Sequence, residues 1–175
     1  MKNKSYDYKI KENVSYIYLE QRSGRVHEII IDTEDLERVL NYKYRWGVYF
    51  DPHIDSFYVR ATVYKYGNVY LHRFLLNLDN DGVFVDHKTN NTLDNRKKNL
   101  RESTSGNNSK NRKSANSNNT SGYRNVTRID GYWRIQLQVD GKNKLFPEKF
   151  TDVDDAGKFA EEMRIKYYSE FAGRN

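Results

Sequence analysis

Residues 83–108 read VFVDHKTNNTLDNRKKNLRESTSGNN, a stretch in which a short apolar segment is followed by a long polar one. The apolar residues 83–85 predict a short strand that ends at Asp86 and His87, side by side. A polar loop and a second short strand around residues 99–101 follow. A carboxylate supplies a hard oxygen for Mg²⁺, and an imidazole can take a proton from water near neutral pH. With a second oxygen ligand from a later helix, the pattern is typical of a one-metal phosphodiesterase site.

Basic charge is concentrated around this stretch. The chain has 175 residues, with 30 Lys and Arg against 24 Asp and Glu, for a net charge of +6. Residues 88–128 alone hold ten basic and two acidic side chains. A basic belt between near-neutral ends is the expected footprint of a protein that binds a polyanion.

The composition excludes several classes of protein. The chain has no cysteine, which excludes disulfides, thiolate metal sites and cysteine nucleophiles. Any metal must therefore be held by His, carboxylate or amide oxygen. We find no apolar run that could cross a bilayer and no signal peptide, so we expect a cytoplasmic protein without membrane contact. The 15 Tyr, 8 Phe and 2 Trp predict small folded cores rather than disorder.

The first hundred residues have the pattern of a strand-rich α+β unit. Alternating apolar residues predict a hairpin over residues 14–31, and a short helix with Leu36, Val39 and Leu40 follows. Three further short strands are expected at residues 46–50, 57–64 and 68–71.

The C-terminal part has a different pattern. Residues 103–121 are almost devoid of apolar side chains and are expected to act largely as a linker, with a polar helix in their first part. From residue 122 two Asp-Gly turns separate three strands, and a capping box at Thr151 and Asp154 predicts a final helix. In the middle strand, core residues alternate with Arg134, Gln136 and Gln138.

The central stretch resembles the HNH endonucleases, in particular the homing type of phages and introns, through the ordered elements LHR, VDH, LDNR and NLR. The resemblance implies that His87 is the general base and that Asp86 and Asn108 hold one divalent ion, Mg²⁺ or Mn²⁺. Asn107 stays open as the alternative ligand. Asn99 would be the middle asparagine, which braces the loop and orients the histidine.

The same resemblance assigns roles to further polar residues. His72 and Arg73 match the HR element, expected on the strand before the site, and Arg73 is an expected DNA contact. Arg96, with Asn95, and Arg101 match the DNR and NLR elements, as loop braces or phosphate contacts. From the basic belt we expect three more DNA contacts, Lys110, Arg112 and Lys113. Because zinc-binding cysteines are absent, the strands of residues 42–76 must hold the motif.

The last 55 residues resemble the AP2/ERF DNA-binding domain through SGYRNV at residues 121–126, Trp133 and the stretch 150–160. That family lays its sheet in the major groove. Arginine can read guanine, glutamine can read adenine, and lysine contacts phosphate. The resemblance thus directs six side chains toward DNA: Arg124, Arg128, Arg134, Gln136, Gln138 and Lys144.

Together these features predict an α+β protein in which a ββα-metal (HNH) catalytic domain precedes an AP2-like domain of three strands and one helix. The expected segments are an N-terminal hairpin with a short helix, the nuclease domain, a linker and the AP2-like domain, at residues 1–42, 43–115, 116–121 and 122–175. The expected function is metal-dependent cleavage of double-stranded DNA by a monomer. A non-cleaving DNA-binding regulator and an RNA-binding protein remain as alternatives.

Overall fold

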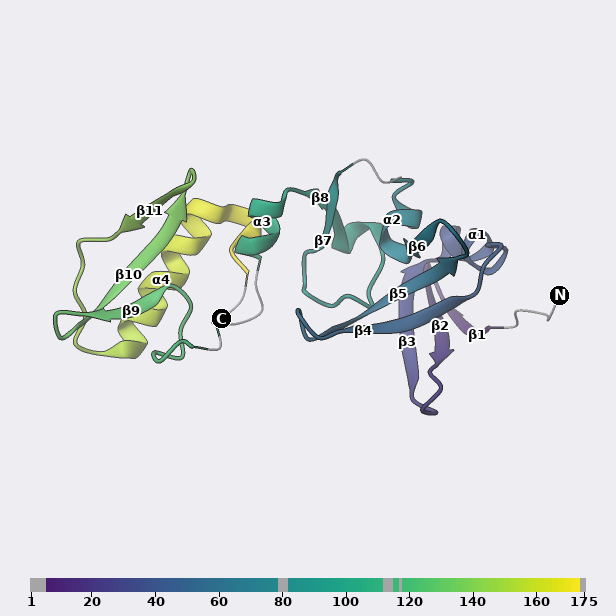
Figure 1. The fold of residues 1–175 in the computed structure, drawn as a ribbon, viewed down its shortest axis with the longest axis horizontal. Coiled ribbons are helices and arrows are strands. Elements are labelled where there is room, and N and C mark those ends of the chain that lie inside the picture. Colours follow the sequence, from purple (N-terminus) through teal and green to yellow (C-terminus); the bar gives the residue numbers. More distant parts are fainter. Residues whose placement is uncertain (1–5, 79–81, 112–114, 117, 174–175) are drawn as a thin grey trace. The chain divides into compact units, whose positions relative to one another are not determined.

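The computed structural model describes residues 6–78, 82–111, 115–116 and 118–173. The fold is mixed α and β, with small antiparallel sheets and few helices. The chain divides into two compact units, Met1–Thr104 and Ser105–Asn175 (Figure 1).

Two three-stranded antiparallel sheets form most of the N-terminal unit. The first consists of β1 (Asp7–Lys11), β2 (Val14–Glu20) and β3 (Val26–Asp32). The second consists of β4 (Trp46–Asp51), β5 (Ser56–Val63) and β6 (Gly67–Tyr70). A short helical segment, η1 (Thr33–Asp35) with α1 (Leu36–Leu40), joins them. The hairpin and the three later strands are confirmed, whereas β1 was not predicted because its exposed sequence DYKIK carries no burial pattern.

One apolar core serves both sheets, which cross each other in Figure 1. Ile29 and Ile31 of β3 pack in the same cluster as Trp46 and Val59 of the second sheet. The indole nitrogen of Trp46 also donates to the carbonyl of Val39 at 3.0 Å. The predicted separation of residues 1–42 from the following domain is therefore wrong, because the apolar residues of β2 and β3 share one buried cluster with residues of the second sheet and of the segment 71–75.

A helix and a two-stranded sheet complete the N-terminal unit. Helix α2 (Leu71–Leu75) carries His72 and Arg73, which were expected on a strand. Leu71 and Leu75 lie four residues apart, so a helix buries both on one face, and this periodicity prevails over the strand-like composition. Antiparallel strands β7 (Phe84–His87) and β8 (Leu100–Ser103) follow, separated by a loop and by η2 (Lys97–Asn99).

The C-terminal unit contains a three-stranded sheet covered on one face by a helix (Figure 1). Its elements are α3 (Ser105–Lys110), β9 (Val126–Ile129), β10 (Tyr132–Val139), β11 (Lys142–Leu145), α4 (Val153–Tyr168) and η3 (Ser169–Phe171). Both predicted Asp-Gly turns are present, with positive φ at each of their residues, as tight hairpins require. The cap of α4 is Asp152 rather than Thr151, since its carboxylate accepts from the amides of Asp154 and Asp155.

The division between the units falls earlier than the predicted linker at residues 116–121. Helix α3 belongs to the C-terminal unit. One reason is Arg124, whose guanidinium donates to the carbonyl of Lys110 at the end of α3 at 2.6 Å. A buried arginine thus ties the polar helix to the sheet that follows it.

Candidate functional site

His87 lies at the end of β7 and is only 4% exposed. Its ring centroid lies 5.2 Å from that of His72 and 6.0 Å from that of Tyr58, both edge-on. On another side, its Nε2 lies 3.4 Å from Oδ1 of Asn95. Helix α2, strand β5 and the loop after β7 together fix the orientation of the imidazole.

The contact with Asn95 indicates which nitrogen of His87 carries the proton. Nδ2 of Asn95 donates to the carbonyls of Leu93 and Thr92, at 3.1 and 3.4 Å, so its Oδ1 is the atom that faces the histidine. An amide oxygen only accepts, and Nε2 of His87 must therefore be protonated. The lone pair of the neutral ring is then on Nδ1, which is the atom able to take a proton.

Burial keeps both histidines neutral. It is the largest cause that lowers the pKa of His87, while Asn95, Asp86 and Asp94 oppose the shift. Burial also lowers the pKa of His72 to about 3, with further contributions from His87 and Arg73. A neutral imidazole at His87 is the form that a general base requires.

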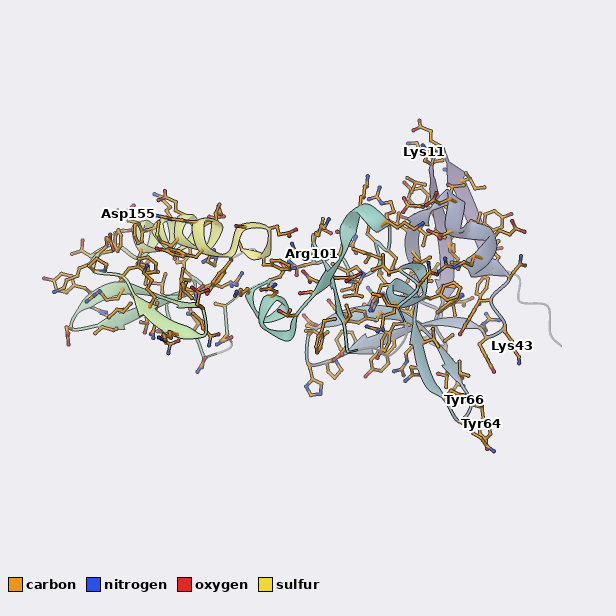
Figure 2. All side chains as sticks on the ribbon, turned by 90° about the horizontal axis from the view of Figure 1, so that it is seen from above. Lys11, Lys43, Tyr64, Tyr66, Arg101 and Asp155 are labelled. Carbon is orange, nitrogen blue, oxygen red and sulfur yellow. The ribbon has the colours of Figure 1, made fainter. Side chains whose placement is uncertain are left out.

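Asp86 lies next to His87 and forms a buried ion pair with Arg101, its cross-strand partner in the β7–β8 register. Nε and Nη2 of Arg101 donate to Oδ2 of Asp86 at 2.8 and 2.5 Å. The side chains are 7% and 11% exposed, for Arg101 and Asp86 respectively. Arg101, labelled in Figure 2, thus contacts the predicted metal ligand, and the structure gives it no outward-facing position for a phosphate contact.

Asn99 is buried and spans the loop between β7 and β8. Its Oδ1 accepts from the amide of Thr89 at 3.0 Å, and its Nδ2 donates to the carbonyl of Asp94 at 2.7 Å. Its own carbonyl accepts from the amide of Lys88 at 2.8 Å. Asn99 therefore makes loop-bracing contacts, whereas the side-chain contact with the histidine comes from Asn95, which was expected to brace the loop or to contact phosphate.

The same loop is fastened to the first sheet. The amide of Ile30 in β3 donates to the carbonyl of Leu93 at 2.9 Å, and the amide of Asn95 donates to the carbonyl of Ile30 at 2.7 Å. Arg96 pairs with Asp94 at 2.5 Å and braces the loop. Support for the site therefore includes β3, in addition to the strands of residues 42–76, and the sequence offered no signal for this long-range pairing.

The predicted metal ligands fall in different units. Asp86 belongs to the N-terminal unit, and Asn107 and Asn108 lie on α3, where the side chain of Asn108 is outside the described residues. Mg²⁺ is commonly bound by one or two carboxylates together with water and substrate phosphates, and Asp86 offers such a carboxylate. Among the described residues, no three His, Cys, Asp or Glu side chains gather around a common point.

Two further predicted contacts in this region have internal partners. The guanidinium of Arg73 donates to the carbonyl of Val83, just before β7, and so positions that strand. Lys110 lies on α3, with its Nζ 3.3 Å from Oδ1 of Asn107 and 5.2 Å from the ring centroid of Tyr168. Arg112 and Lys113 lie outside the described residues.

On the C-terminal sheet, only half of the predicted DNA-facing side chains share one face. Arg124 is 6% exposed and donates to the carbonyls of Lys110 and Ala172, so its predicted outward orientation is wrong. Arg128 pairs with Trp133, and Lys144 pairs with Leu137 and donates to the hydroxyl of Tyr167 on α4. Both therefore lie on the helix side of the sheet. Arg128 lies two residues after the core residue Val126, so the alternation along the strand already predicted that both side chains lie on the helix side of the sheet.

The remaining three, Arg134, Gln136 and Gln138, lie on the opposite face. The two glutamines are exposed and have Asn125, Thr127 and Asn143 as neighbours around one hollow of the C-terminal unit, of about 610 Å³. Arg134 is half-buried and donates to the carbonyl of Phe146 at 2.8 Å. We call this surface the amide face, because amide side chains outnumber charged ones on it.

Comparison with known proteins adds no assignment: no protein-family model, curated protein or solved structure matches the chain. None of the helices in the described part of the chain combines the length and apolar character needed to span a membrane.

Proposed function

We propose that the chain is a metal-dependent DNA endonuclease of the HNH homing type. The observation that carries the proposal is the placement of His87, which is buried at the end of β7, directly after Asp86 in the chain, with its Nε2 3.4 Å from Oδ1 of Asn95. The order of β7, β8 and α3 along the chain is that of a ββα-metal fold and supports the proposal, with α3 in the C-terminal unit. The basic belt favours nucleic acid as the substrate.

In the proposed reaction, Nδ1 of His87 takes a proton from a water molecule as the water oxygen attacks a backbone phosphorus. The bond from phosphorus to the 3′-oxygen then breaks, and the 3′-oxygen takes a proton from solvent, which leaves a 5′-phosphate and a 3′-hydroxyl. Asp86 and, by the HNH resemblance, Asn108 would hold a divalent ion. When bound, that ion supplies positive charge that stabilises the phosphorane and the leaving oxygen. Asn95 keeps the imidazole in the reactive tautomer, and Asn99 keeps the loop around it in place.

The amide face would read base edges, as the AP2 resemblance implies. Gln136 and Gln138 have the bidentate amide that pairs with adenine. Arg134 would add one cationic contact, while Arg124 would act inside the unit.

Supercoiled plasmid incubated with the full chain tests the proposal. We expect nicked or linear product with Mg²⁺, none with EDTA, and 5′-phosphate ends that ligase can rejoin. Absence of product with Mg²⁺ and with Mn²⁺, under conditions in which the protein binds the plasmid, would contradict it.

That negative result would support the second candidate, a DNA-binding regulator that does not cleave. The observation that favours it is the Asp86–Arg101 ion pair, because the guanidinium already neutralises the carboxylate that would hold the ion. Metal-insensitive binding to DNA without product would establish this alternative.

A further inference from the structure

The N-terminal unit has a groove of about 680 Å³ between the end of the β2–β3 hairpin and strands β4 and β5. Three arginines, Arg22, Arg45 and Arg60, line it, together with a single carboxylate, Glu20. None of these residues belongs to the HNH motif or to the basic belt at residues 88–128. We call this surface the arginine groove.

The arginines of the groove are available to bind an anion. The guanidinium of Arg60 lies 3.7 Å from the ring centroid of Tyr49, and that of Arg45 lies 5.9 Å from the ring centroid of Tyr6. Within the described part of the chain, Arg22, Arg45 and Arg60 form no ion pair with a carboxylate. This differs from Arg96 and Arg101, whose charges are neutralised internally. Guanidinium groups without an internal counter-ion are suited to phosphate.

Strand register connects the groove to the candidate active site. Tyr49 of β4 pairs directly with Tyr58 of β5, and Arg60 lies two residues beyond Tyr58 on the same face of the sheet. The ring of Tyr58 in turn contacts that of His87, with centroids 6.0 Å apart. One sheet face therefore leads from Arg60 to the proposed base.

Gly47 leaves space inside the groove. It pairs with Arg60 across the β4–β5 ladder, and a Cβ added at Gly47 would meet no atom within 4 Å. The position opposite the guanidinium is thus open to an incoming group.

We propose that the arginine groove binds the sugar–phosphate backbone of duplex DNA and directs it to His87. The direction toward His87 rests on the nuclease proposal, whereas the binding itself does not. The occupant follows from charge complementarity: three cationic forks along one groove match a chain with a phosphate at each nucleotide.

The test measures binding of a fluorescent mixed-sequence duplex to the full chain, by anisotropy, at several salt concentrations in EDTA to prevent cleavage. For Arg45→Ala/Arg60→Ala we expect at least tenfold weaker binding. The slope of log affinity against log salt should fall by about 1.8, because each lost phosphate contact removes about 0.9. The matched control is Lys9→Ala/Lys11→Ala, which removes the same charge from the exposed edge strand β1. Lys11, labelled in Figure 2, pairs with Val14 at the start of β2, whereas Glu20 of the groove lies at the other end of that strand.

A second variant tests the groove without removing an arginine. Gly47→Glu places a carboxylate opposite Arg60 in open space, so it should weaken binding while the thermal unfolding temperature stays close to that of the wild type. Gly47→Ala fills the position without charge and should bind the duplex as the wild type does.

The outcomes separate the two proposals. If the salt slope falls in the arginine variant and the wild type does not cleave plasmid, the groove proposal holds and the nuclease proposal is refuted. If the wild type cleaves plasmid and the arginine and lysine variants have equal salt slopes, only the groove proposal is refuted. If the wild type binds a structured RNA more tightly than the duplex, and the arginine variant loses that binding, the occupant of the groove is RNA and the proposal of DNA is refuted.

Discussion

The arginine groove and the amide face are both polar surfaces on small antiparallel sheets, yet their chemistry differs. The groove has three arginines without a carboxylate partner among the described residues, set against one glutamate. The amide face has two exposed glutamines, asparagines beside them and one arginine that already donates to a carbonyl. Cations bind the uniform charge of a backbone, whereas amides distinguish base edges. We infer that the N-terminal unit would supply affinity and the C-terminal unit sequence preference.

The two units also differ in the charged groups that they bury. The N-terminal unit buries the Asp86–Arg101 ion pair and three histidines, His27, His72 and His87. The C-terminal unit has the fully buried Arg164, which donates to the carbonyl of Arg124, and its Asp155–Lys158 pair is exposed. Substitutions in the two units should therefore differ in their effect on stability.

The largest expected effect is that of Arg101→Ala. It leaves the carboxylate of Asp86 buried without its guanidinium, and the free energy of unfolding should fall by about 3–5 kcal/mol. Urea unfolding of the full chain measures this. Lys158→Ala breaks an exposed pair in the other unit and should change the free energy by less than about 0.5 kcal/mol. Similar losses in the two variants would refute this contrast.

Gly157→Ala should destabilise the C-terminal unit. An added Cβ would lie 2.5 Å from Cδ1 of Tyr123, and the hydroxyl of Tyr123 donates to Asp154 at 2.7 Å, which restricts the ring. The overlap should cost about 1–3 kcal/mol and outweigh the helix propensity of alanine, which is worth about 1 kcal/mol. Fluorescence of Trp133 during unfolding, in a Trp46→Phe background, follows this unit. A gain in stability would show that the ring moves aside freely.

The buried His72 should make stability depend on pH. Its folded pKa is about 3 and the ordinary value is 6.5, so between these values the unfolded chain binds the extra proton. The free energy of unfolding should therefore fall as the pH drops below about 6.5, by about 1.4 kcal/mol per pH unit from this residue. His72→Phe should remove that part of the slope in urea unfolding between pH 7 and pH 5. An unchanged slope would assign the effect to other groups.

The smallest effect is expected on the amide face. Gln136→Ala removes a base-reading group but no charge, so binding to a mixed-sequence duplex should change by less than about twofold, with an unchanged salt slope. Anisotropy measured alongside the arginine groove variants makes the comparison direct. A fall in slope like that of Arg45→Ala/Arg60→Ala would mean that both surfaces bind phosphate in the same way.

Local sequence patterns predicted much of the fold. The alternation of residues 14–31 and the two Asp-Gly turns predicted strands that the structure contains, because such signals depend only on neighbours in the chain. The candidate site depended on more distant pairings. The Asp86–Arg101 contact follows from the β7–β8 register, and the burial of Arg124 depends on carbonyls at Lys110 and Ala172, so no local pattern could predict either.

The central claim is that His87 is the base of a DNA-cleaving site, and the cleavage rate of His87→Ala tests it most directly. The variant is compared with the wild type and with His53→Ala, which removes an exposed histidine in the turn after β4. In single-turnover plasmid cleavage with Mg²⁺, His87→Ala should be slower by a factor of about 10²–10⁴, and His53→Ala should match the wild type. Equal rates for the wild type and a folded His87→Ala protein would contradict the account.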